Sequence, residues 1–289
     1  MKKTIYRLGL VILIVGLLAA CSSNAQSETI HVKIGVTGSD GQSWDIIKEG
    51  AAEEGIEIEL VEFSDYTLPN HALANEEVDI NSFQHLAFLS QFNVENDYNI
   101  VPIGATVIAP LGIYSDNYDS IEDFPDGGEI AVPNDPANLG RSLRLLESAG
   151  LIELGADVGL YGTLDDIVSN PKDLDIVLVA PQQTPRVLPD VVASVINSGI
   201  AGQAGLYIDD TLFYDDPYSE EARPYVNVFA VNEADKDNEA FLTIARLYQT
   251  EEVEEAVRED TNGGSLVVDI DVEDLQETLT QLQNDIKAE

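Results

Sequence analysis

The segment Asn134-Asp-Pro-Ala-Asn-Leu-Gly-Arg-Ser-Leu143 joins a short apolar stretch, Glu129 to Pro133, to a predicted helix that ends near Gly150. The helix is predicted from an Asn or Asp that can serve as N-cap, a glycine just past the end, and apolar residues at helical spacing between them, namely Leu139, Leu143, Leu146 and Ala149. We therefore interpret this segment as a binding loop between a strand and a helix.

Arg141 lies within this segment, and the predicted helix start puts it in the first turn. Free backbone N–H groups and the positive end of the helix dipole favour an anion there, and a guanidinium beside them is a planar two-point donor. A ligand carboxylate would fit such a site. The alternative is that a carboxylate of the chain pairs with Arg141, either Asp135 or another of its many acids, and the spacing leaves both open.

Strand–helix alternation extends on both sides of this segment. A strand at 31–36, a helix at 43–55 and a strand at 56–63 form a first β-α-β unit. Further strands are predicted near 80 and at 99–102, 128–133, 176–179, 191–196 and 225–231, and further helices at 238–248, 251–259 and 272–288. This alternation predicts an α/β fold with largely parallel sheets.

The net charge of the chain limits the classes of partner that it can bind electrostatically. Its 289 residues include 14 basic and 53 acidic side chains, a formal net charge of −39. Such a surface repels nucleic acid and anionic membranes, so binding to either through charge is excluded. The excess of Asp and Glu suits a saline or alkaline habitat, and we expect added salt to raise the thermal stability.

The first 20 residues have the pattern of a signal peptide, with basic residues before the apolar run 8–20. That run is short for a membrane-spanning helix. It ends in Leu18-Ala-Ala-Cys21, which resembles the lipobox of bacterial lipoproteins, so we expect a lipidated Cys21 followed by a flexible tether over 21–28. A free structural cysteine is the alternative. Because Cys21 is the only cysteine, the mature domain contains no disulfide and no thiol nucleophile.

An aromatic stretch lies between Phe63 and Phe88. Aromatic faces with a few polar tips suit a pocket for a small apolar side chain, including a thioether. Core packing is the alternative for Phe63, Phe83 and Phe88. Tyr66 and His85 are better candidates, because each combines an apolar body with a polar atom that needs a partner when buried.

Patterns for metal binding and catalysis are weak. His71 and His85 lie fourteen residues apart without a closely spaced His or Cys ligand. The chain contains no Gly-x-Ser-x-Gly and no glycine-rich phosphate motif, and Ser142 has no histidine base nearby in the sequence. We expect no metal, no cofactor and no enzymatic activity.

Two asparagines end or interrupt apolar runs, Asn197 and Asn227. An asparagine offers an acceptor and donors, as the ammonium and carboxylate of an amino acid require. Turn chemistry at the strand ends is the alternative for each.

Taken together, these motifs resemble the methionine-binding lipoproteins of ABC importers. The likeness covers about 34–264, and its most specific part is Asn134–Ser142 within the segment that starts at Ala131. The other motifs that carry it are Phe63-x-Asp-Tyr66-x-Leu-Pro-Asn70, Asn81-x-Phe-Gln-His85, Val195-Ile-Asn197 and Pro224-Tyr-Val-Asn227.

The resemblance implies a two-lobed, type II periplasmic-binding-protein-like fold, with two α/β domains joined by hinge crossovers. One lobe would comprise 29–118 and 227–289, and the other 119–226. Arg141 would bind the ligand carboxylate, while Asn138, Asn197 and Asn227 would bind its polar end. Tyr66, Phe83, His85 and Phe88 would line the side-chain pocket.

The sequence departs from the family pattern in three places. Phe88 stands where the family often has Tyr, and both 187–190 and 198–202 differ around the second asparagine. Beyond Gly264 the chain is longer and predicted to be helical. The resemblance leaves open whether this tail docks on a lobe.

The implied function is that of a monomeric receptor, lipid-anchored to the extracytoplasmic face of the cell membrane. It would deliver L-methionine or a close relative to an ABC permease powered by its ATPase. Three alternatives are a hydrolase, a surface interaction protein or adhesin, and the same fold with another ligand, such as methionine sulfoxide, D-methionine, a methionine-containing dipeptide or another apolar amino acid.

Overall fold

The structure is a computed structural model that describes residues 29–39 and 41–288. The expected signal peptide, Cys21 and the tether lie outside the described residues. Within the described part, no helix is long and apolar enough to cross a bilayer.

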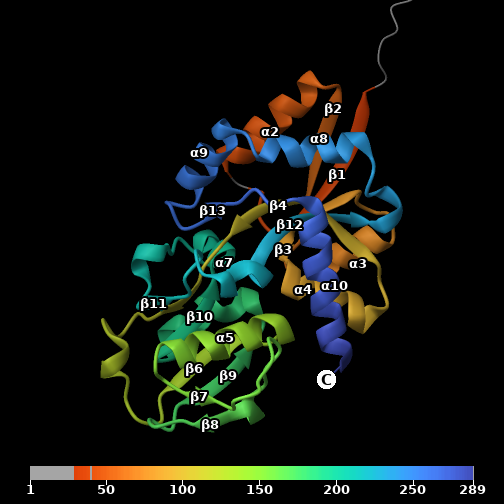
Figure 1. The fold of residues 1–289 in the computed structure, drawn as a ribbon. Coiled ribbons are helices and arrows are strands. Elements are labelled where there is room, and N and C mark those ends of the chain that lie inside the picture. Colours follow the sequence, from red (N-terminus) through yellow and green to blue (C-terminus); the bar gives the residue numbers. More distant parts are fainter. Residues whose placement is uncertain (1–28, 40, 289) are drawn as a thin grey trace, which may run out of the picture.

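Two mixed sheets organise the chain (Figure 1). The larger has the order β13-β4-β12-β3-β1-β2, with β1 Ile30–Val36, β2 Ile56–Glu62, β3 Ile80–His85, β4 Ile100–Ile108, β12 Val226–Asn232 and β13 Leu266–Val267. The smaller has the order β11-β5-β10-β6-β9, with β5 Leu111–Tyr114, β6 Glu129–Pro133, β9 Asp175–Val179, β10 Ala193–Asn197 and β11 Phe213–Tyr214. A separate two-stranded ribbon contains β7, Glu153–Leu154, and β8, Ile167–Ser169.

The α/β class is confirmed, but the expectation of largely parallel sheets is wrong. The pairings β1–β2, β1–β3, β6–β10 and β6–β9 are parallel. The pairings made by β5, β12 and β13 are antiparallel. The reason is topological: β12 returns from the smaller sheet and enters the larger one antiparallel to both of its neighbours, β3 and β4.

Helices cover the faces of both sheets. The larger sheet carries α2 Gln42–Glu53, α3 Leu68–Ala74, α4 Leu86–Asn96, α8 Glu239–Tyr248, α9 Glu251–Asp260 and α10 Val272–Ala288. The smaller carries α5 Pro136–Ser148, α6 Thr184–Val187 and α7 Ser198–Gln203. The sequence-predicted helices are confirmed, with ends within two residues of the expected ones at α2, α5, α8, α9 and α10.

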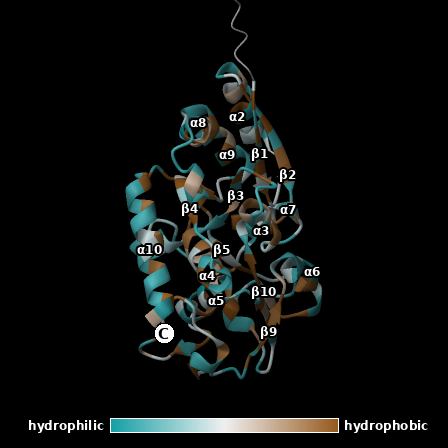
Figure 2. Ribbon diagram, turned by 90° about the vertical axis from the view of Figure 1, so that its right-hand side faces the viewer, coloured by the Kyte–Doolittle hydropathy of each residue, from teal (hydrophilic) through white to brown (hydrophobic). Residues whose placement is uncertain are grey.

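Apolar side chains explain this layering. Two clusters flank the larger sheet: one includes Ile34, Ile47 and Phe229, and the other is built around β12 with α4 and α10. A third fills the space between the smaller sheet and α5 and includes Leu143. Figure 2 shows apolar strands inside and helices with polar outer faces. Burial of these faces is the main favourable term that holds each layer in place.

The tail beyond Gly264 docks on the larger sheet. Leu275, Leu279 and Leu282 of α10 are buried against a cluster that includes Leu86 and Leu89 of α4. The family resemblance left open whether this tail packs against a lobe. In the structure it does, because α10 covers an apolar face formed by α4 and β4.

The chain passes twice between the sheets. β4 ends at Ile108 and β5 begins at Leu111, so we name 109–110 the outward crossover. β11 ends at Tyr214 and β12 begins at Val226, so we name 215–225 the return crossover. The outward crossover thus lies before residue 118, which is the predicted end of the first segment of lobe 1. The division into moving lobes stays a prediction.

The topology also determines where a ligand can lie. β1 and β3 of the larger sheet and β6 and β10 of the smaller sheet all end at the gap between the two sheets, and the residues that follow them line the same space. Loops at the carboxyl ends of parallel strands are the usual binding positions of open α/β sheets.

Candidate ligand-binding site

A cavity of about 710 Å³ is lined by residues from both sheets and their helices. Cavities of this size are typical of small-molecule sites. All eight ligand-binding residues predicted from the sequence line it, namely Tyr66, Phe83, His85, Phe88, Asn138, Arg141, Asn197 and Asn227.

The start of α5 differs from the expectation in one respect. Asp135 is the N-cap, and its Oδ1 accepts the backbone N–H of Asn138 at 2.9 Å. The helix begins at Pro136, so Arg141 is its sixth residue and lies in the second turn, not the first. The first turn therefore does not form the expected anion site with the guanidinium, because Arg141 lies one turn further along and the Asp135 carboxylate already accepts the N–H of Asn138.

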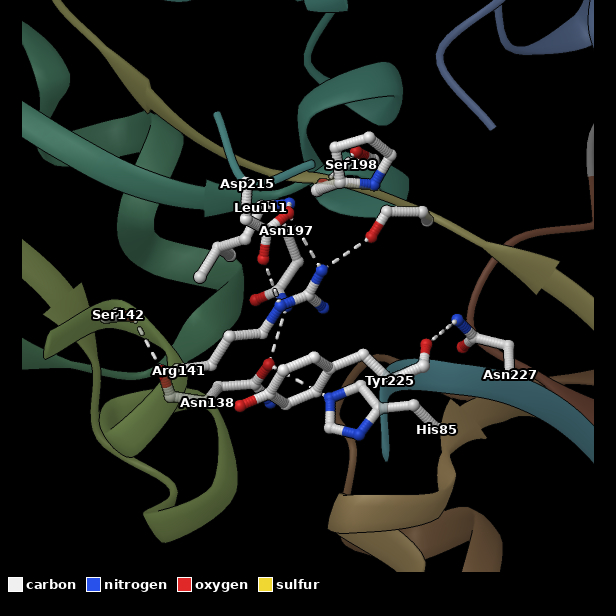
Figure 3. Close-up of polar contacts among 12 residues, drawn as sticks. His85, Leu111, Asn138, Arg141, Ser142, Asn197, Ser198, Asp215, Tyr225 and Asn227 are labelled. Atoms are coloured by element: carbon white, nitrogen blue, oxygen red, sulfur yellow. Dashed lines mark hydrogen bonds and ion pairs between the residues drawn. The ribbon is translucent and has the colours of Figure 1, made fainter. Parts of the chain in front are cut away.

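The guanidinium of Arg141 is paired with Asp215 (Figure 3). Nε donates to Oδ2 at 2.6 Å and Nη2 to Oδ1 at 3.1 Å, while Nη2 also donates to the carbonyl of Ala109 at 2.9 Å. The alternative that a carboxylate of the chain pairs with Arg141 is thus correct, but the partner is Asp215 and not Asp135.

This pairing leaves one side of the guanidinium open. The side chain of Arg141 is 4% exposed, yet it lines the cavity, and Nη1 has no hydrogen-bond partner among the described residues. Cζ lies 4.3 Å from the ring centroid of Tyr225, a cation–π distance. The guanidinium is therefore fixed in orientation while two N–H donors of Nη1 remain available.

A chain of hydrogen bonds links the two sheets beside Arg141. The backbone N–H of Phe88 donates to His85 Nδ1 at 3.1 Å, and His85 Nε2 lies 3.3 Å from Asn138 Oδ1. Because Nδ1 accepts, a neutral His85 carries its proton on Nε2 and donates it to Asn138. Asn197 Nδ2 donates to the same Oδ1 at 2.7 Å. The Oδ1 of Asn197 is buried without a partner in the described chain, so an acceptor remains at the cavity wall.

His85 is neutral in this environment. Burial, followed by the positive charge of Arg141, lowers its pKa from 6.5 to about 3. A neutral imidazole at the cavity wall adds no second positive charge beside the guanidinium.

An aromatic cluster forms the adjoining wall. Ring centroids of Tyr66, Phe83 and Phe88 lie 6.0 to 6.1 Å apart in tilted and edge-to-face arrangements. Phe88 and Phe92 also stack, at 6.3 Å. Burial raises the pKa of the Tyr66 hydroxyl, with the charge of Asp135 as the next cause, so this hydroxyl stays protonated as a donor. The cluster thus provides both core packing and an apolar pocket wall.

Asn227 lies at the cavity beside the crossovers. Its Nδ2 is 3.3 Å from the carbonyl of Val107 and 3.5 Å from that of Tyr225. These contacts occupy the amide donor, and the Oδ1 atom has no partner among the described residues.

The histidine pair does not form a metal site. His71 Nδ1 contacts the hydroxyl of Tyr98 at 3.1 Å, and the exposed side chain of His31 on β1 lies beside Glu57. Among the described residues, no group of three or more His, Cys, Asp or Glu side chains could hold a metal ion.

Sequence reasoning missed several residues of the site. Asp215 had no distinguishing signal among 53 acids. Tyr225 belongs to the motif Pro224-Tyr-Val-Asn227, but no binding role was predicted for it. Trp44, Tyr248 and Asp260, which also line the cavity, were not predicted either, because they come from three different helices, α2, α8 and α9.

The fold and site together define a two-lobed binding-protein architecture, and comparisons with known proteins agree. The NlpA lipoprotein family matches residues 32–268. The D-methionine-binding lipoprotein MetQ of Salmonella typhimurium is 41% identical over 254 residues, which cover 86% of this chain and 92% of that protein. Lipoprotein 28 of Escherichia coli O157:H7 is 37% identical, with 92% and 99% covered.

Solved structures are similar over most of the chain. Protein PG110 from Staphylococcus aureus matches with a TM-score of 0.85 and 42% identity, covering 87% of this chain and 99% of that one. A nutrient binding protein from Burkholderia cenocepacia, bound to methionine, matches with a TM-score of 0.77 and 38% identity, covering 82% and 100%. The chain therefore belongs to the NlpA lipoprotein family.

Proposed function

We propose that this protein is the substrate-binding lipoprotein of an ABC importer that captures methionine or a close relative between its two lobes. Its relatives include a D-methionine-binding lipoprotein and a protein crystallised with methionine. The single observation that carries the proposal is the arrangement around Arg141, where donors, acceptors and an aromatic wall converge in one cavity between the sheets.

Each part of the ligand has a partner of matching chemistry. Nη1 of Arg141 and the hydroxyl of Tyr66 would donate to the carboxylate, and Oδ1 of Asn197 and of Asn227 would accept from the ammonium. Phe83 and Phe88 would contact the thioether, which gains from aromatic edges. Such matching is required because a charged group that stays unpaired after burial costs several kcal/mol.

The protein would perform no chemistry on its ligand. Its relatives are binding proteins, and His85, the one titratable base at the centre of the site, uses Nδ1 and Nε2 in structural hydrogen bonds. Ser142 donates to the carbonyl of Asn138 rather than to a base. The proposed partners are a permease and its ATPase, and the proposed attachment is a lipid on Cys21 at the extracytoplasmic face.

Isothermal titration calorimetry tests the ligand. We expect L- or D-methionine to bind more tightly than norleucine, which lacks the sulfur, and much more tightly than the methionine amide. Mass spectrometry of the ligand released by denaturing gently purified protein would identify the bound species. If no methionine derivative binds and none is released, the proposed function is wrong.

A second ligand class, a methionine-containing dipeptide, is favoured by the charges along the cavity. Among the described residues, Arg141 is the only Lys or Arg side chain in the lining, which also contains two carboxylates, those of Glu62 and Asp260. An α-amino acid carries both charges on one carbon, but a peptide separates them. Competition between methionine and glycylmethionine distinguishes these ligands, and Glu62→Gln should weaken the peptide more than methionine. Asp260 is unsuitable for this test, because its two carboxylate oxygens accept the backbone N–H groups of Gln42 and Ser43 at the start of α2.

A further inference from the structure

The guanidinium of Arg141 lies where the two crossovers meet. Nη2 donates to the carbonyl of Ala109 in the outward crossover, and Nε donates to Asp215, the first residue of the return crossover. Tyr225, the last residue of the return crossover, faces the guanidinium with its ring. One side chain of α5 therefore contacts both connections between the sheets (Figure 3).

Asp215 is itself fixed by the start of β5. The backbone N–H of Leu111 donates to Asp215 Oδ1 at 2.8 Å, and the backbone N–H of Asp215 donates to the carbonyl of Leu111 at 3.2 Å. Asp215 does not line the cavity, and its side chain is 27% exposed. It thus contacts the guanidinium from outside the cavity lining.

We propose that Asp215 is a positioning residue that clamps Arg141 against both crossovers and leaves Nη1 as the free amino group that faces the ligand. A ligand carboxylate bound at Nη1 is then connected, through one rigid guanidinium, to the two segments about which the lobes would move. The identity of that ligand rests on the proposed function, whereas the clamp rests on the contacts of the chain itself.

The clamp has a physical consequence for the empty protein. Arg141 is almost fully buried, and Asp215 is the carboxylate that balances its charge. Removal of one partner from such a pair leaves an uncompensated buried charge, which is strongly destabilising. Without Asp215, hydration of the guanidinium lowers its free energy, so the lobes should separate. Small anions should bind where the Asp215 carboxylate was.

Chemical rescue tests this assignment in the ligand-free protein. In Asp215→Ala we expect a loss of about 10 °C in melting temperature. Sodium formate, a small carboxylate, should recover much of that loss, and sodium chloride at equal concentration should recover less. Asp216→Ala is the matched control, because Asp216 is exposed and accepts from the backbone N–H of Tyr218 without contacting Arg141. Equal effects of formate and chloride on Asp215→Ala would overturn the charge role.

Small-angle scattering tests the hinge role on the same variants. We expect a larger radius of gyration for ligand-free Asp215→Ala than for Asp216→Ala, and a return towards the control value in formate. Identical radii would overturn the connection to lobe separation. Both measurements use no methionine derivative, so they can fail or succeed independently of the proposed function.

Discussion

His85 Nε2 lies 3.3 Å from Asn138 Oδ1, and this contact joins the end of β3 in the larger sheet to the first turn of α5 beside the smaller one. It is one of several polar contacts between the parts of the chain that carry the two sheets. Gln203 of α7 donates to the carbonyl of Thr37 after β1, and Tyr161 contacts Ser90 of α4. Polar contacts from three different pairs of segments thus link the parts of the chain that carry the two sheets.

The buried imidazole predicts a pH-dependent stability. His85 is neutral in the folded protein with its pKa lowered to about 3, whereas an unfolded histidine protonates near 6.5. Between these values the unfolded state binds the proton, so stability is full above about pH 6.5 and falls as pH drops towards 3. Relative to His85→Gln, the wild type should lose up to about 1.4 kcal/mol per pH unit in this window.

Denaturant unfolding at pH 7.5, 5.5 and 4.5 measures this difference. His31→Gln is the control, because the His31 side chain is 73% exposed. Parallel pH profiles for the wild type and His85→Gln would contradict the assignment of a neutral buried His85.

Arg141→Ala should abolish most ligand binding. It removes the charged donor Nη1 and leaves Asp215 without its partner, and the loss of a charged hydrogen bond is worth about 1.5–3 kcal/mol, or roughly tenfold to 150-fold in affinity. Arg144→Ala is the control on the same helix, because Arg144 donates to the carbonyls of Val158 and Gly159 away from the cavity. If calorimetric titration finds equal affinities for the two variants, the assignment of Arg141 as a ligand contact is wrong.

Gly140→Ala should distort the site through a steric clash. A Cβ at this position would lie 2.0 Å from the carbonyl oxygen of Leu160, which is backbone and cannot move aside easily. The resulting shift of α5 displaces both Asn138 and Arg141, so we expect a stability loss of about 3 kcal/mol and weaker binding.

Gly199→Ala is the matched helical control, because nothing lies within 4 Å of its added Cβ. It should retain or slightly raise the stability, since alanine is the better helix former. Thermal melts that show no difference between the two variants would contradict the close approach of α5 to Leu160.

The C-terminal helix should contribute measurably to folding. Leu279 of α10 is buried against α4 and β4, so Leu279→Ala should cost about 2–5 kcal/mol in the free energy of unfolding. Glu277→Ala, on the exposed side of the same helix, should change it by less than about 0.5 kcal/mol. A cost near zero for Leu279→Ala would mean that α10 does not dock in solution.

Several features followed from the sequence because they depend on local chemistry. Hydrophobic periodicity predicted the longer strands of both sheets and five helices, α2, α5, α8, α9 and α10, but not α3, α4, α6 or α7. A capping Asn or Asp and Gly150, which has a positive φ of 74°, marked the two ends of α5. Seven of the eight candidate site residues lie in the motifs that carry the family likeness, Phe88 lies just beyond one of them, and all eight line one cavity. Each of these inferences needed only the residues within a short window or a family likeness.

The strand directions and the partner of Arg141 depended on tertiary structure. Strand spacing cannot reveal that β12 returns between β3 and β4, because that depends on the path of the whole chain. Asp215 lies 74 positions from Arg141, and no local signal separates it from 52 other acids. The sequence, through the family likeness, predicted that Arg141 would lie at a ligand site, and Arg141 does line the cavity. Only the folded chain decided which carboxylate balances its charge, because that choice depends on distance in space.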